Sequence, residues 1–151
     1  MLTITPFLWF DTQAEDAMKF YTSIFRRSTV HAVHRAQGRV MAVEFEIEGK
    51  RVMGLNAGPV HKFTEAFSFF VGCDTQEQID DLWAKLLAGG GRPDQCGWLK
   101  DQFGLSWQII PKGLGSMLGD PDPARSQRVM QAMLAMVKLD LPALQAAYAG
   151  S

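Results

Sequence analysis

The stretch Phe7-Leu8-Trp9-Phe10-Asp11-Thr12-Gln13 decides the fold, because its last three residues recur in the second half of the chain as Asp74-Thr75-Gln76. An apolar run precedes each copy, and in the second half this run is Phe69-Phe70-Val71. Apolar residues at helical spacing follow each copy: Ala14, Ala17, Met18, Tyr21 and Ile24, and then Ile79, Leu82, Trp83, Leu86 and Leu87. The repeat predicts two strand–helix units of the same design.

Both helices are predicted to begin with a capping box. Thr12 is followed three residues later by Glu15, and Thr75 is followed by Gln78. In this motif the Thr hydroxyl accepts a hydrogen bond from the amide three residues on, while the longer side chain reaches back. The first helix is expected to end near residues 25–27. The second is expected to end at Gly89-Gly90-Gly91, because glycine adopts the left-handed conformation that closes helices.

Up to three strands are predicted after each helix. Residues 40–47 alternate apolar and acidic side chains, which is typical of a half-buried strand, and a turn at residues 48–50 leads into the next strand. In the second half, residues 98–101 and 105–111 form the corresponding pair. The first of these strands in each unit is predicted at residues 31–35 and 92–96. The modules of this α+β fold are expected at residues 1–57 and 65–111.

Residues 112–151 have no counterpart in the first half and are predicted to form a helical extension. Asp122-Pro123 and Asp140 are helix-start signals. An apolar stripe follows the first of them and is expected to be core or a subunit contact. It consists of Val129, Met130, Met133, Met136 and Val137.

Composition excludes several classes of partner. The 151 residues carry 15 Lys and Arg against 16 Asp and Glu, so there is no basic field for a nucleic acid. No apolar run approaches the roughly 18–20 residues that cross a membrane, and the N-terminus lacks the pattern of a signal peptide. Cys73 and Cys96 could form at most one bridge. Reduced thiols in a cytoplasm are therefore expected.

The duplicated strand–helix–three-strand unit resembles the vicinal oxygen chelate superfamily, which includes glyoxalase I, bleomycin-resistance proteins and extradiol dioxygenases. The chain is most similar to the PhnB-like branch, often labelled 3-demethylubiquinone-9 3-methyltransferase. The matching stretches are residues 4–11, 14–25, 68–71, 96–101 (Cys-Gly-Trp-Leu-Lys-Asp), 103–111 and the tail 130–148. The resemblance implies two βαβββ modules whose curved mixed sheets close around a cleft. It also implies a homodimer, in which chains sometimes exchange elements.

The resemblance also locates the superfamily's four metal-ligand positions, at Thr5 or Pro6, Met53, Ser68 and Gln108. Only Gln108 offers a donor of the usual type, because a thioether is soft and a serine hydroxyl binds hard divalent ions poorly. No metal and no other cofactor is therefore expected. His31 and His34 lie three apart on a predicted strand and should point to opposite faces. They and His61, in a loop, are expected to be surface or packing residues.

Other chemistries find little support in the sequence. An S-adenosylmethionine site usually has a glycine-rich turn after its first strand, but Asp11-Thr12-Gln13 contains no glycine. Cys73 stands beside Asp74, which disfavours a thiolate. Cys96 lies near Lys100, but no histidine is close to it along the chain. The catalytic candidates are Gln108, Cys96 and Asp101.

What remains is a predicted aromatic cleft with sparse polar groups, which is typical of a small-molecule site. The candidate ligand-binding residues are Phe7, Trp9, Asn56, Ser68, Trp98, Trp107 and Gln108. The alternative is that the rings simply fill the core. The sequence favours a metal-independent small-molecule binding protein or enzyme. A metal-dependent lyase, isomerase or dioxygenase of the same fold, a methyltransferase and a purely structural dimer stay open.

Overall fold

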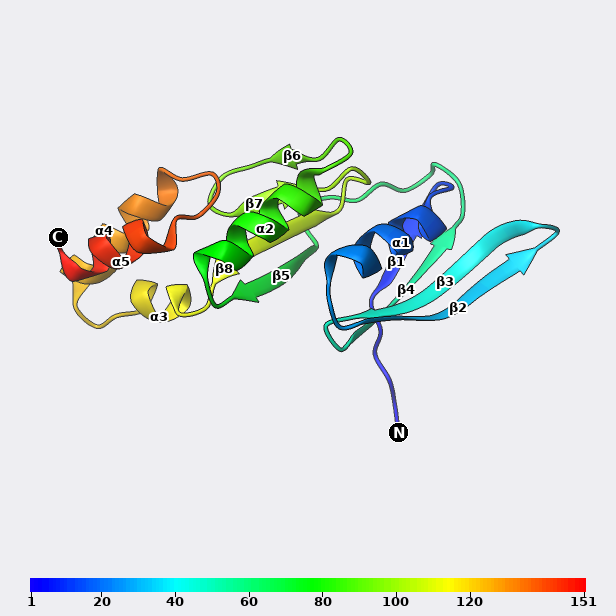
Figure 1. The fold of residues 1–151 in the computed structure, drawn as a ribbon, viewed down its shortest axis with the longest axis horizontal. Helices are drawn as coiled ribbons and strands as arrows, with labels where there is room; N and C mark the ends of the chain where they lie inside the picture. The colour runs from blue at the N-terminus through cyan, green and yellow to red at the C-terminus, as the bar shows by residue number, and fades with distance from the viewer. The chain divides into compact units, whose positions relative to one another are not determined.

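The computed structural model describes residues 1–151 as two compact units, Met1–Phe63 and Thr64–Ser151 (Figure 1). The elements of unit 1 are β1 (Phe7–Phe10), α1 (Ala14–Ile24), β2 (Ser28–Ala36), β3 (Arg39–Ile47) and β4 (Lys50–Asn56). Its sheet has the order β1-β4-β3-β2, in which β1 runs parallel to β4 and the other pairs are antiparallel.

Unit 2 repeats this design with a sheet of order β5-β8-β7-β6, in which β5 is parallel to β8. Its elements are β5 (Ser68–Cys73), α2 (Gln76–Leu87), β6 (Arg92–Pro93), β7 (Trp98–Lys100) and β8 (Ser106–Pro111). The predicted α+β fold with two βαβββ modules is confirmed. The strand expected at residues 92–96 is only the two residues of β6.

One helix covers one face of each sheet, and the alternation along the strands decides which residues it buries. In unit 1, Val43, Phe45 and Ile47 of β3 are buried, whereas Glu44 and Glu46 between them are half-buried on the opposite face. Their partners in the core include Ala17, Met18 and Tyr21 of α1. In unit 2 the corresponding buried strand residues are Leu99, Trp107 and Ile109, and α2 buries Ile79, Trp83 and Leu86.

The predicted capping box is correct for α2 and wrong for α1. Thr75 Oγ1 accepts a hydrogen bond from Gln78 N at 3.1 Å, and Gln78 Oε1 accepts one from Asp74 N at 2.7 Å. Helix α1 instead begins after Gln13, whose side chain makes no capping bond. Its first amide, Ala14 N, donates to Asn56 Oδ1 at 2.9 Å.

Asn56 is therefore a long-range cap from the end of β4, and its Nδ2 also donates to Val40 O at 3.1 Å. Replacing Asn56 with Ala is expected to lower the free energy of unfolding by about 1–2 kcal/mol, because a buried helix amide loses its acceptor. Thr12→Ala is the matched control and should change it by less than about 0.5 kcal/mol. Urea unfolding followed by far-UV circular dichroism measures both, and a larger loss in Thr12→Ala would contradict the assignment.

The expectation that His31 and His34 point to opposite faces is also wrong. The pairing of β2 with β3 shifts between Val30 and Ala32, so His31 is an extra residue in a β-bulge. As a result both rings reach β3 on one face, where His31 Nε2 lies 3.4 Å from Glu46 Oε1 and His34 Nε2 lies 2.8 Å from Glu44 Oε2. The hydrogen bond from His34 lowers the pKa of Glu44.

The C-terminal extension forms α3 (Leu114–Leu118), α4 (Pro123–Leu134) and α5 (Leu141–Ala149) within unit 2. Asp122 and Asp140 cap α4 and α5 as predicted, through Ala124 N and Ala143 N. The core between the helices contains Ile110, Leu114, Val129, Leu139 and Leu144, whereas Met130 and Val137 of the predicted stripe are exposed.

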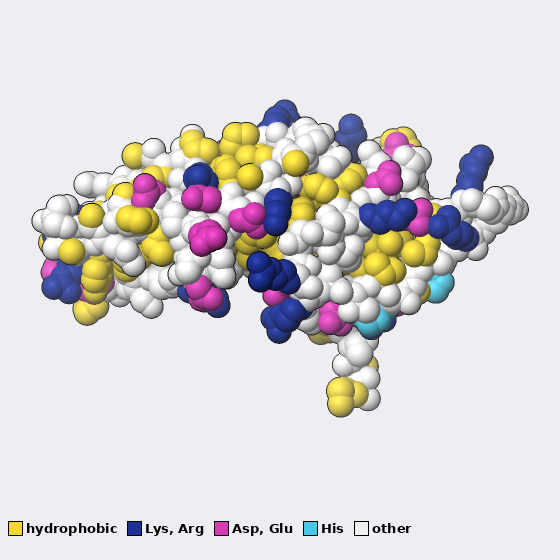
Figure 2. All heavy atoms as spheres, in the orientation of Figure 1, with side chains coloured by type: hydrophobic (Ala, Val, Ile, Leu, Met, Phe, Trp, Pro, Cys, Tyr) yellow, Lys and Arg dark blue, Asp and Glu magenta, His cyan; other side chains and the backbone are white.

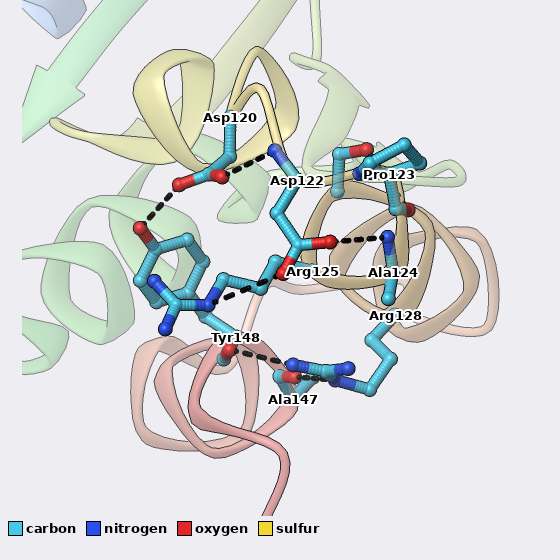
Figure 3. A network of polar contacts seen from close by, with 9 residues as sticks. Asp120, Asp122, Pro123, Ala124, Arg125, Arg128, Ala147 and Tyr148 are labelled. Atoms are coloured by element: carbon cyan, nitrogen blue, oxygen red, sulfur yellow. Dashed lines mark hydrogen bonds and ion pairs between the residues drawn. The ribbon is translucent and has the colours of Figure 1, made fainter.

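A polar network ties α4 to α5 at the far end of the extension (Figure 3). Tyr148 Oη donates to Asp120 Oδ2 at 2.5 Å, and the Arg125 guanidinium lies 5.3 Å from the centroid of the Tyr148 ring. Arg128 donates to the carbonyl oxygens of Ala147 and Tyr148 at 2.8 and 3.0 Å. These contacts hold the last helix in place. No helix in the structure combines the length and apolar character that crossing a membrane requires.

Candidate ligand-binding face

The side of each sheet opposite its helix carries no helix from the βαβββ module. We call the face opposite α2 the open face of unit 2. Strand alternation and register place Ser68, Phe70, Trp98, Lys100, Ser106 and Gln108 on it, together with Arg92 of β6 and, beneath the C-terminal extension, Ile110. Three of these, Ser68, Trp98 and Gln108, are predicted ligand-binding residues. Phe70, Lys100 and Ser106 are not among the predicted ligand-binding residues, although each lies two residues from one of them on the same strand.

Gln108 occupies the middle of the open face. In register, Phe70 lies beside it on β5 and Trp98 lies beside it on β7. Gln108 Nε2 donates to Ser68 Oγ at 2.9 Å, which fixes the orientation of the amide. The Phe70 side chain is 64% exposed, although most aromatic rings of this chain are buried or half-buried. The arrangement presents two rings on either side of one oriented amide.

The next row along the same face is polar. It consists of Ser68, Ser106, Lys100 and Arg92, which are neighbours in register across β5, β8, β7 and β6. The Lys100 ammonium forms an ion pair with Glu65, from the segment before β5, and this contact lowers the pKa of Glu65. Ser106 is 1% exposed, and its Oγ has no hydrogen-bond partner. Unpartnered buried hydroxyls are uncommon in folded proteins.

The C-terminal extension covers the other end of this face. Ile110 follows Gln108 on the same side of β8 and packs with Leu114, Val129, Leu139 and Leu144. The extension therefore leaves uncovered the aromatic row at Gln108 and the polar row at Ser106, in which the Ser106 side chain is itself buried. Two rings and a few oriented polar groups are the composition that small-molecule sites share.

Unit 1 also has an open face, on which Phe7 and Trp9 stand. Phe7 is exposed, whereas Trp9 is half-buried and its Nε1 donates to Gly58 O at 3.0 Å. The ring of His61 meets that of Trp9 edge-on, with centroids 4.7 Å apart. His61 is thus a packing residue on Trp9. Asn56 lies at the end of β4 with both polar atoms engaged in the cap described above. Figure 2 shows His side chains at the surface of this unit.

Two of the predicted site residues lie in the core. Trp107 is 1% exposed on the α2 side of β8, and its Nε1 donates to Asp101 Oδ2 at 2.9 Å. Asp101 is 3% exposed and also accepts from Phe103 N and Leu105 N. These contacts assign both residues to the packing of the turn between β7 and β8. The ring of Trp107 does not reach the open face.

The cysteines are both free thiols. Cys73 is buried, and burial together with Asp74 raises the pKa of its thiol to about 11, as the sequence indicates. Cys96 has a left-handed backbone, with φ of 59°, and its N–H donates to Met136 O at 2.9 Å. Both observations suit structural residues better than nucleophiles.

The residues at the metal-ligand positions that the resemblance implies do not fit a hard divalent ion. Met53 offers a thioether, the Ser68 hydroxyl is bonded to Gln108, and Pro6 uses its carbonyl to accept from Met53 N at 3.0 Å. The chain has no group of three or more His, Cys, Asp or Glu side chains arranged to hold a metal ion.

The features that usually bind S-adenosylmethionine are also absent from the two βαβββ modules. The triplet after β1 has no glycine, and Gly91 N donates to Leu87 O at the end of α2. Its amide is therefore not free to bind a cofactor at a helix N-terminus. Neither mixed sheet has the doubly wound parallel order of the common nucleotide-binding folds.

Comparison with known proteins agrees with this fold. Residues 2–110 match the family model described as 3-demethylubiquinone-9 3-methyltransferase. A PhnB protein from Bacillus cereus is 33% identical, with a TM-score of 0.67, over 73% of this chain and 99% of that one. The family match ends at residue 110, so the expected resemblance of the tail at residues 130–148 stays a prediction. A search among curated proteins finds no match.

More distant structures share the fold alone. A glyoxalase/bleomycin resistance protein from Albidiferax ferrireducens is 13% identical, with a TM-score of 0.51, over 74% of this chain and 99% of that one. The fosfomycin resistance protein FosX from Mesorhizobium loti is 9% identical, with a TM-score of 0.59, over 79% of this chain and 99% of that one.

Proposed function

The chain belongs to the 3-demethylubiquinone-9 3-methyltransferase family within the vicinal oxygen chelate superfamily, and on that basis we propose that it binds a small organic molecule without a metal ion. The ligand is aromatic or amphipathic and lies on the open face of unit 2. The observation that carries the proposal is the oriented Gln108 amide between Phe70 and Trp98. Such a ligand stacks on the rings and bonds to the amide oxygen.

We also propose that this chain forms a homodimer, as the resemblance to the superfamily implies. Native mass spectrometry of the gently purified protein reports the subunit number, any bound divalent metal and any retained organic molecule in one spectrum. A dimer free of metal is the expected species. A stoichiometric metal ion would contradict the metal-independent proposal and favour a metal-dependent lyase, isomerase or dioxygenase of the same fold.

The ligand-binding face is tested with Trp98→Ala. Binding of the uncharged probe 2-naphthamide, measured by isothermal titration calorimetry, is expected to weaken about tenfold, because one stacking partner and its buried apolar area are lost. The matched control is Leu134→Ala, which removes an exposed apolar side chain from α4 and should leave the affinity unchanged.

Two results would contradict the proposal. Equal affinity in Trp98→Ala and the unaltered protein would reject the open face as the site. Loss of 2-naphthamide binding after dialysis against EDTA, with recovery on adding a divalent ion, would reject metal independence. A saturable heat with S-adenosylmethionine would instead favour the methyl transfer that the family's description names.

A further inference from the structure

We infer that the open face of unit 2 takes an aromatic ligand that carries a carboxylate, which replaces Glu65 on the Lys100 ammonium and reaches the hydroxyl of Ser106. This inference rests on the proposed function, since it uses the same face. It adds the charge of the ligand and the residues that recognise that charge.

Lys100 supplies a positive charge near the centre of this face, and Arg92 of β6 is its neighbour in register toward the sheet edge. Lys100 lies two residues from Trp98 on β7, and both side chains point to the same side of the sheet, because Leu99 between them is buried on the other side. Same-face neighbours on a strand are about 7 Å apart. A ring stacked on Trp98 therefore brings a carboxylate attached to that ring within reach of the Lys100 ammonium.

The contact with Glu65 shows which chemical group the Lys100 ammonium binds. The carboxylate of Glu65 already pairs with the ammonium, but this side chain is exposed and comes from the irregular segment before β5. Ion pairs between such solvated groups are weak, because water competes and the side chains lose freedom when they pair. A ligand carboxylate that is also held by ring stacking can therefore displace Glu65.

Ser106 supplies an independent observation. Its hydroxyl is buried without a partner directly beside Lys100 in register, and Ser68 is its neighbour on the other side. The Ser68 hydroxyl is already the acceptor of the Gln108 amide. A carboxylate oxygen that replaces Glu65 at Lys100 would accept a hydrogen bond from Ser106 and satisfy the one side-chain polar atom that the buried part of the chain leaves unpaired.

Two probes of the same shape separate charge from stacking. Binding of 2-naphthoate and of neutral 2-naphthamide is measured by isothermal titration calorimetry on the full chain. In Lys100→Met the affinity for 2-naphthoate is expected to fall about tenfold or more, because a charge-assisted contact is lost. The affinity for 2-naphthamide should change less than about twofold, because its contacts with Trp98 and Gln108 are kept.

Glu65→Gln tests the competition directly. Removing the resident carboxylate is expected to tighten 2-naphthoate binding by about threefold or more and to leave 2-naphthamide unchanged. Ser106→Ala should weaken 2-naphthoate without lowering the stability of the protein, since its hydroxyl has no partner to lose. Lys85→Met is the matched control, because Lys85 forms an ion pair with Asp81 on the outer surface of α2.

The outcomes separate this inference from the proposed function. If 2-naphthamide binds and depends on Trp98, but Lys100→Met and Glu65→Gln leave 2-naphthoate unchanged, the carboxylate assignment is overturned and the binding face stands. An equal loss of affinity for both probes in Lys100→Met also overturns it, since Lys100 would then support binding to the face without distinguishing a charged ligand from a neutral one. If neither probe binds the unaltered protein, the aromatic face and its charge preference fail together.

Discussion

Asp101→Ala is expected to lower the free energy of unfolding by about 3–5 kcal/mol, the largest effect of any single substitution on the residues described above. The Asp101 carboxylate accepts three hydrogen bonds, from Phe103 N at 2.9 Å, Leu105 N at 3.1 Å and Trp107 Nε1 at 2.9 Å. Alanine would take this acceptor away from all three donors, of which Leu105 N and Trp107 Nε1 are buried. An unpaired buried donor destabilises a protein by about 1–3 kcal/mol.

The controls for Asp101→Ala separate burial from charge. Asp94 also accepts a local backbone bond, from Gln95 N at 2.8 Å, but it is exposed, so Asp94→Ala should lose less than about 1 kcal/mol. Asp101→Asn keeps one acceptor oxygen, so its loss of unfolding free energy should lie between the losses of Asp101→Ala and Asp94→Ala. Urea unfolding followed by tryptophan fluorescence measures all three. Equal stability of Asp101→Ala and Asp94→Ala would contradict the structural role assigned to Asp101.

Gly97→Ala is expected to destabilise the protein by about 3 kcal/mol and to loosen the C-terminal extension. Gly97 has a φ of 86°, and its N–H donates to Val137 O at 2.7 Å, at the junction between α4 and α5. An added Cβ would lie 2.9 Å from Ile109 O, 3.0 Å from Ile110 Cδ1 and 3.1 Å from Leu139 Cδ1. The new methyl group would push the extension away from β8.

Gly104 provides the matched control for this substitution. Its φ of 87° is nearly the same, but an added Cβ would meet nothing within 4 Å. Gly104→Ala should therefore lower the free energy of unfolding by only about 1–2 kcal/mol, because alanine disfavours the left-handed backbone but meets no neighbouring atom. Limited proteolysis of the region after residue 112 reports the loosening, and faster cleavage is expected in Gly97→Ala only. Identical unfolding and cleavage in the two variants would show that Gly97 does not anchor the extension.

The sequence predicted the fold well because the signals that specify it are local and repeated. Alternation along β3, the apolar helix pattern and the Thr75 capping box each depend on residues within one or two turns of one another. The errors come from long-range contacts. The α1 cap is provided by Asn56 from a distant strand, and a single extra residue at His31 reverses the face of His34.

The candidate site was partly predictable for the same reason. Gln108, Ser68 and Trp98 were found from the resemblance and from their strands, and the register places them on one face. Trp107 and Gln108 are adjacent on β8, so their side chains point to opposite sides of the sheet and cannot both line one face. The alternation of Ser106 and Gln108 with Trp107 and Ile109 indicates that Trp107 is the residue on the buried side. Lys100 and Ser106 were missed because an ion pair and an unpartnered hydroxyl are visible only in three dimensions.

The most direct test of the ligand-binding face is a titration of the ¹⁵N-labelled protein with 2-naphthamide, followed through the indole N–H signals of its tryptophans. The open-face account predicts that the signals of Trp98 and of the Gln108 side-chain amide shift together and saturate. The indole signals of Trp83 and Trp107, on the α2 side of the sheet, should stay in place. Saturable shifts at Trp83 and Trp107 with none at Trp98 would contradict the account.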